Sequence, residues 1–97
     1  MQMHNEEIDE LCEIVVVENE RGLHARAAAK FVRVASAHRA RIDVECADMR
    51  VSGLSIMGLM MLAATKGSQL KLYASGGDAA ATVHALADLV KRGFDEN

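Results

Sequence analysis

Five consecutive residues, Gly22-Leu23-His24-Ala25-Arg26, place a histidine and an arginine where a strand-like segment gives way to a helix-like one. The first backbone N–H groups of a helix have no partners inside the helix, and the helix dipole leaves partial positive charge there. A histidine beside such a terminus, with an arginine two residues later, could take up a phosphoryl group without a metal. The simpler alternative is a loop histidine that caps the helix or faces water, since short motifs have many chance matches.

The composition describes one small domain. The chain has 97 residues, 51% of them hydrophobic, which is enough for a single core. Residues 1–11 are polar and acidic and are predicted to be a flexible leader, unlike a secretory signal, while residues 12–97 form the domain. No apolar run is long enough to cross a membrane. A net charge of −3 without a basic, aromatic-rich cluster gives no support for nucleic-acid binding.

Hydrophobic patterning predicts four strands and three helices. Runs of β-branched or alternating apolar residues mark the strands, at Cys12–Asn19, Arg41–Cys46, Met49–Ser52 and Gln69–Ala74. Apolar stripes and capping residues mark the helices, at Ala25–His38, Ser55–Leu62 and Ala79–Arg92. The order β-α-β-β-α-β-α predicts an α+β fold, a four-stranded antiparallel sheet with three helices on one face.

Smaller features of these elements are also predicted. Asp78 is expected to cap the last helix, and Gly93 to adopt a left-handed conformation just after it. Cys12 and Cys46 lie in separate strands and are expected to be free, buried thiols in a cytoplasmic protein.

The short helix at Ser55–Leu62 is apolar nearly all round. Leu59, Leu62 and Ala63 fall on one side of it, and the opposite side carries Met57, Met60 and Met61, with Ile56 at the flank. Either the surrounding loops bury both sides, or the methionines form an exposed surface for a partner. The sequence leaves both open.

Two further features suit interaction or regulation. Arg26, Lys30 and Arg33 form a basic stripe in line with His24, which is usually a solvated face but could meet an acidic partner. Ser55 precedes a helix, so it is a capping residue whose position would also suit a phosphate.

Taken together, the element order, GLHAR and LSIMGLMML resemble the HPr family, the histidine phosphocarriers of the bacterial phosphotransferase system. The likeness covers residues 12–94, and MLAA-x-KG with the closing Gly93–Glu96 resembles the nitrogen-related branch called NPr. The resemblance implies an open-faced β-sandwich and a carrier protein, not an enzyme, that needs no cofactor. Enzyme I, charged by phosphoenolpyruvate, would pass a phosphoryl group to a histidine ring nitrogen, usually Nδ1, and an EIIA-type protein would accept it.

The resemblance also assigns roles to residues. His24 would be phosphorylated, and Arg26 would steady the phosphate with the backbone N–H groups of Ala25 and Arg26. Ser55 aligns with the serine that a dedicated kinase phosphorylates in some members. Partner docking would use the apolar short helix and two basic residues, namely Ile56, Met57, Met60, Met61, Lys30 and Arg33. The chain departs from the family at Ala27, where proline is common, and at Leu54, where a basic or polar residue is frequent.

Other functions remain to be weighed. A regulatory ligand-binding module has the same ferredoxin-like element order, but it would leave His24 and Arg26 without a role. A protein that regulates only through Ser55 would be expected to lack the histidine, which is present. No metal site is predicted, because His4, His24, His38 and His84 show no ligand spacing. The carrier is expected to be a monomer with an open histidine site, since it must release its cargo.

Overall fold

Strands with one buried and one exposed side build a four-stranded sheet in the computed structural model, which describes residues 10–96. The elements follow the expected order: β1 (Leu11–Val16), α1 (Ala25–Ser36), β2 (Arg41–Cys46), β3 (Met49–Ser52), α2 (Ile56–Met61), β4 (Gln69–Ser75), α3 (Ala79–Lys91) and the 3₁₀ turn η2 (Gly93–Asp95). The strand order is β1-β4-β2-β3, and every neighbouring pair is antiparallel.

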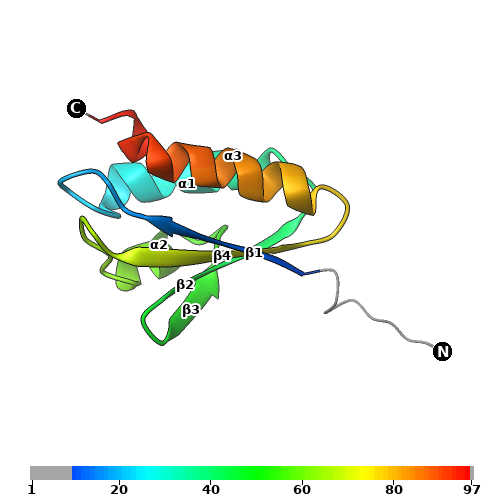
Figure 1. Ribbon diagram of the computed structural model, residues 1–97, viewed down its shortest axis with the longest axis horizontal. Coiled ribbons are helices and arrows are strands. Elements are labelled where there is room, and N and C mark those ends of the chain that lie inside the picture. The colour runs from blue at the N-terminus through cyan, green and yellow to red at the C-terminus, as the bar shows by residue number, and fades with distance from the viewer. Residues whose placement is uncertain (1–9, 97) are drawn as a thin grey trace.

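The helices form a layer over one face of the sheet, so the fold is the open-faced β-sandwich that was expected. α1 and α3 lie side by side over the strands (Figure 1), and α2 packs against α1 and β3. The strand residues beneath the helices are almost fully buried, among them Val15, Ile42, Val44, Leu70, Leu72 and Ala74. Phe31 of α1 and Leu86 of α3 close the core from above, and both are completely buried.

Four predicted elements are longer than the observed ones. The helix predicted at Ser55–Leu62 spans Ile56–Met61, and the helix predicted to Arg92 ends at Lys91. The strand predicted to Asn19 ends at Val16, although a last pair of hydrogen bonds joins Val17 to Ser68 and Gly67 before the chain turns. The helix predicted to His38 ends at Ser36, because its final N–H groups bond back three residues instead of four. The ring of His38 then takes part in a 2.9 Å hydrogen bond with the carbonyl of Val34.

Two local predictions were wrong, and a third was right in position only. Asp78 occupies the N-cap of α3 as predicted, but its carboxylate accepts from the backbone N–H of Arg39 at 3.0 Å and not from the helix. Ala63 is exposed, because it follows the end of α2 with a positive φ of 54° and no longer obeys the helical spacing. Both cysteines are free, as expected, yet Cys12 is exposed on the edge strand and Cys46 is half-buried.

The last turn of the chain brings η2 back toward the start of α1. Gly93 adopts the predicted left-handed conformation, with φ of 66°, at the end of α3. Phe94 follows it and is completely buried, which anchors the end of the described chain to the core. The predicted leader lies almost entirely outside the described residues. Within residues 10–96, no helix is long and apolar enough to cross a membrane.

Candidate functional site

His24 occupies the N-cap of α1, the position that the sequence predicted. Its backbone is extended, with φ −73° and ψ 178°, and its carbonyl accepts the N–H of Ala28 at 2.9 Å. Its side chain makes no capping hydrogen bond with the helix. The N–H groups of Ala25 and Arg26 have no intrahelical acceptor, since they belong to the first turn. They are therefore available to an anion beside His24.

The turn before His24 is fixed by close contacts. Gly22 has a positive φ of 65°, and a side-chain carbon there would lie 2.2 Å from the carbonyl oxygen of Ala64. The N–H of Leu23 donates to that same carbonyl at 3.0 Å, and the Leu23 side chain is buried. Glycine permits the close approach, and leucine anchors the chain one residue before His24.

The carboxylate of Glu96 lies against the His24 ring, which the sequence did not predict. Oε2 of Glu96 is in direct hydrogen-bond contact with Nε2 of His24. Oε1 of Glu96 accepts from Nδ2 of Asn19 at 2.9 Å, and the same Nδ2 donates to the carbonyl of Gly22 at 2.9 Å. The His24 side chain is consequently only 17% exposed. The expected open site is thus covered at Nε2 by the end of the chain.

Electrostatics keep Glu96 ionised. Burial raises the pKa of the Glu96 carboxyl, but hydrogen bonds from Asn19 and His24, with the charges of His24 and Arg21, outweigh it and leave that pKa below its ordinary value. An ionised carboxylate can only accept hydrogen bonds. Nε2 of His24 must therefore be the donor in this contact.

The segment that carries Glu96 is held at several points. Nζ of Lys30 donates to the carbonyl of Phe94 at 2.7 Å, so this residue of the predicted basic stripe also ties α1 to η2. Arg92 and Asp95 form an ion pair at 2.9 Å, and the N–H of Glu96 donates to the carbonyl of Gly93 at 3.0 Å. Glu96 therefore reaches His24 from a fixed backbone.

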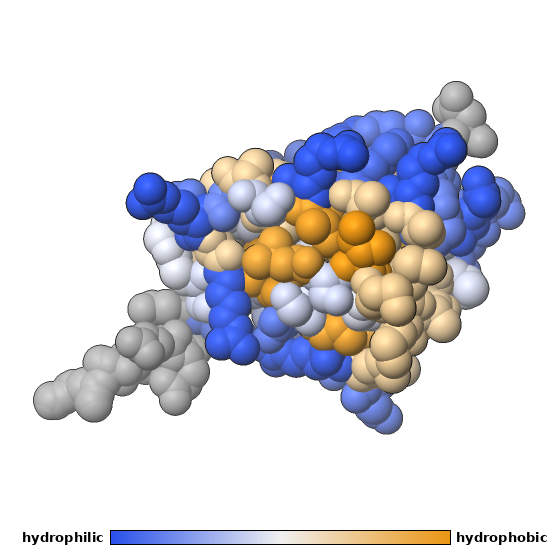
Figure 2. Space-filling model, turned by 180° about the vertical axis from the view of Figure 1, so that it is seen from behind, coloured by the Kyte–Doolittle hydropathy of each residue, from blue (hydrophilic) through white to orange (hydrophobic). Residues whose placement is uncertain are grey.

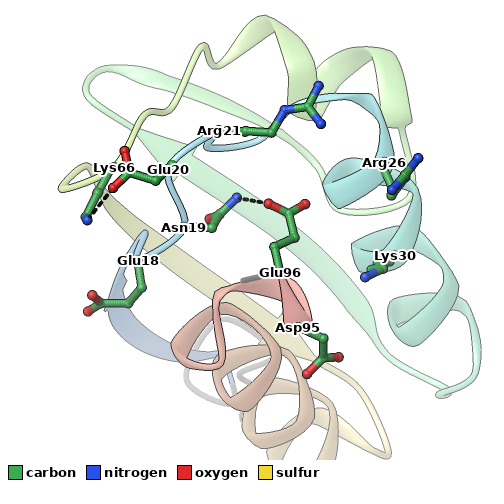
Figure 3. Close-up of a pocket in the computed structure, with 9 residues that line it drawn as sticks. All are labelled: Glu18, Asn19, Glu20, Arg21, Arg26, Lys30, Lys66, Asp95 and Glu96. Atoms are coloured by element: carbon green, nitrogen blue, oxygen red, sulfur yellow. Dashed lines mark hydrogen bonds and ion pairs between the residues drawn. The ribbon is translucent and has the colours of Figure 1, made fainter.

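A pocket of about 530 Å³ opens beside this contact. Figure 3 shows Glu96 and Asn19 near its centre, with Arg26 and Lys30 on the α1 side and Arg21 on the preceding turn. Arg26 is exposed. Glu20 and Lys66 pair with each other at 2.8 Å at the opposite edge.

The α2 face is the second predicted site, and its methionines are exposed. Met57 is 71% exposed and Met61 64%, whereas Leu59 on the opposite side is fully buried. Leu54, Ile56 and Met60 extend the apolar surface, which is visible as the orange and tan area of Figure 2. Of the two possibilities for this helix, burial of both sides is excluded.

The remaining predicted residues lie at the start of α2, on α1 and on α3. Ser55 caps α2, since its hydroxyl accepts from the N–H of Gly58 at 2.9 Å. Arg33 is exposed on α1, and His84 is exposed on α3. Among residues 10–96, no three His, Cys, Asp or Glu side chains gather as a metal site would require.

Sequence reasoning missed Asn19, Arg21 and Glu96 as parts of the His24 site. Asn19 and Arg21 lie within five residues of His24, so their proximity along the chain was a usable signal. Glu96 is 72 residues away, and only the glycine turn at Gly93 and the buried Phe94 hinted that the chain folds back there.

Comparisons with known proteins identify the family of this chain. Residues 12–92 match the family described as "PTS HPr component phosphorylation site". The chain is 49% identical over 78 residues to the phosphocarrier protein HPr of Neisseria meningitidis serogroup A, covering 80% of this chain and 88% of that protein. It is 39% identical over 82 residues to the phosphocarrier protein NPr of Shewanella violacea, covering 84% and 90% respectively.

A solved structure gives the same result for the fold. The crystal structure of HPr-C-His from Thermoanaerobacter tengcongensis superposes with a TM-score of 0.85 at 39% identity. The match covers 90% of this chain and 98% of that one.

Proposed function

The chain belongs to the HPr family of phosphocarrier proteins of the phosphotransferase system, and from this premise we propose that His24 accepts and returns the phosphoryl group. Members of this family carry a phosphoryl group between proteins and are not themselves catalysts. The single observation that carries the assignment is the place of His24, at the N-cap of a twelve-residue helix with its side chain uninvolved in capping.

The transfer step needs a neutral imidazole nitrogen as nucleophile. Its lone pair forms the N–P bond while the bond from phosphorus to the donor breaks, and the electron pair of that bond stays on the donor. The chain contributes positioning and charge stabilisation, which are the main requirements of phosphoryl transfer. The N–H groups of Ala25 and Arg26 would bind the phosphoryl oxygens, and the Arg26 guanidinium would offset their charge. Ala27, where the family often has proline, leaves one more N–H donor in this turn.

The donor would be phosphorylated Enzyme I and the acceptor an EIIA-type protein. Both would dock on the exposed apolar residues of α2, Ile56, Met57, Met60 and Met61, with Lys30 and Arg33 meeting acidic residues of the partner. Exchange between two partners requires short-lived complexes, so each interface should be modest. This function places the protein in the cytoplasm, as a monomer, and is compatible with either the sugar-transport or the nitrogen-related branch.

Ser55 would provide regulation where the host has a serine kinase for this family. A phosphate on Ser55 would keep an acceptor oxygen near the N–H of Gly58, and it would add negative charge at the edge of the α2 face. Enzyme I or an acceptor that docks there with acidic groups would then bind more weakly. Leu54, exposed in front of Ser55, makes the kinase recognition sequence different from the usual one.

The decisive experiment is phosphorylation with Enzyme I and phosphoenolpyruvate, read by mass spectrometry without acid. The wild-type protein should gain one phosphoryl group, and His24→Ala should gain none while keeping its fold. His84→Ala is the matched control, because His84 is exposed on α3 away from the site. Labelling of His24→Ala at the wild-type rate would refute the assignment. A wild-type protein that takes no phosphate would favour the regulatory ligand-binding module instead.

A further inference from the structure

Glu96 contacts the ring that the proposed function uses, yet it lies beyond the residues 12–92 that match the family. We propose that Glu96 is a positioning residue, which holds the proton of the neutral His24 ring on Nε2 and presents the Nδ1 lone pair to the phosphoryl donor. This inference rests on the proposed function of His24.

The argument begins with the two possible forms of a neutral imidazole. One ring nitrogen carries the proton and the other carries the lone pair, and the partner of one nitrogen decides which form is present. Oε2 of Glu96 contacts Nε2, and an ionised carboxylate accepts but cannot donate. The contact therefore selects the form with the proton on Nε2. Nδ1 is left as the nucleophile.

The same contact fixes the ring in space. Glu96 is held by Asn19 through Oε1, and Asn19 is held by the carbonyl of Gly22, two residues before His24. Donation to two acceptors from Nδ2 also fixes the orientation of the Asn19 amide. A carboxylate that orients an imidazole and selects its tautomer plays this part in the Ser-His-Asp triad.

Glu96 also faces the charge that develops during transfer. When the Nδ1 lone pair forms the bond to phosphorus, the ring keeps its Nε2 proton and becomes positively charged. The P–donor bond breaks at the same time, and its electron pair leaves with the donor. The Glu96 carboxylate lies against the Nε2 proton and stabilises this cationic ring.

The test compares Glu96→Ala and Glu96→Gln with the wild type and with Glu20→Gln. Glu20 is the matched control, because it lines the same pocket but pairs with Lys66 and does not touch His24. Nitrogen-15 NMR of the histidine rings reports the tautomer of His24 near neutral pH. Phosphoramidate, a small phosphoryl donor, then labels the protein, and phosphorus-31 NMR distinguishes phosphate on Nδ1 from phosphate on Nε2. His24→Ala identifies the signals of the other histidines.

The wild type and Glu20→Gln should hold the proton on Nε2 and carry the phosphate of His24 on Nδ1. Glu96→Ala should contain both tautomers of His24 and gain phosphate on Nε2 as well. In Glu96→Gln, the proportions of the two tautomers and of the two phosphorylated forms should lie between those of the wild type and of Glu96→Ala. Acceptance from phosphorylated Enzyme I should slow about tenfold in Glu96→Ala, as for the loss of partners that orient a functional histidine. Amide NMR spectra verify that each variant is folded.

Unchanged tautomer and phosphorylation site in Glu96→Ala would overturn the inference. Faster acceptance in that variant would also overturn it, since Glu96 would then be a blocking anion. The small donor separates this result from a failure of the proposed function, because it requires no partner protein. A wild type that reacts with phosphoramidate on Nδ1 but takes nothing from Enzyme I would refute the phosphocarrier role alone.

Discussion

Gly22 shows how single residues determine the position of His24. Its backbone lies in the left-handed region, and its α-carbon passes close to the carbonyl of Ala64, which accepts the N–H of Leu23. Any side chain there would press on backbone, which cannot move aside as a flexible side chain can. Gly22 therefore contributes to the stability of the fold and to the geometry of the site.

Gly22→Ala is expected to destabilise the protein by about 2 kcal/mol, from the positive φ and the clash with Ala64 together. Urea denaturation followed by circular dichroism measures this free energy of unfolding. Gly77→Ala is the control, since a side-chain carbon at Gly77 meets nothing within 4 Å and its φ is not in the left-handed region. Equal stability of the two variants would contradict the role given to the turn.

For the individual residues of the His24 site, proximity along the chain decided what could be predicted. The position of His24 and Arg26 at the start of a helix could be predicted, because it depends on local spacing and a helix start, which the sequence displays directly. The contact between His24 and Glu96 depends on how α3 packs against α1 and where Gly93 turns the chain. No local pattern encodes that distance, so the open site predicted for His24 was wrong at Nε2.

Among the elements, the hairpin of β2 and β3 was predicted with its observed bounds. Alternation of apolar and polar residues fixes the register, and Cys46 pairs with Met49 across the two-residue turn. Ala47 takes a positive φ of 55° there, without the glycine or asparagine that usually marks such a turn. Helix ends were predicted less well: α1 ends at Ser36 and not at His38, because its final N–H groups bond back three residues instead of four.

The α2 face yields a prediction for docking. Met57→Asp places a charge at the centre of an exposed apolar surface, where desolvation on complex formation would oppose binding. Transfer from phosphorylated Enzyme I should slow about tenfold, which corresponds to about 1.4 kcal/mol, while stability changes by less than about 0.5 kcal/mol. Rapid-quench kinetics and thermal unfolding measure the two effects.

Met49→Asp is the matched control for this variant, because Met49 is also an exposed methionine but lies on β3, at the turn of the hairpin. If both substitutions slow transfer equally, added negative charge alone explains the effect. If neither does, the α2 face is not the docking surface.

At the scale of the whole molecule, the site is made by closure of the chain on itself. The turn after β1, the start of α1 and the last described residues meet at Glu96, while Lys30 and the buried Phe94 hold that closure in place. The element order and the antiparallel sheet followed from pattern alone, because each strand and helix buries one side. The contact of Glu96 with His24 could not be predicted from pattern, because it depends on tertiary packing.

This closure should make stability depend on acid. The folded state lowers the pKa of Glu96 from its ordinary value of 4.5, so its stabilisation is complete above that pH and is lost as the pH falls through the lower, folded value. Glu96→Gln should therefore be less stable than the wild type by about 1 kcal/mol at pH 7, and the difference should vanish in strong acid. Urea titrations of both proteins from pH 7 to pH 2 measure the difference in their free energies of unfolding. If that difference stays constant across the range, the charge of Glu96 does not stabilise its contacts with His24 and Asn19.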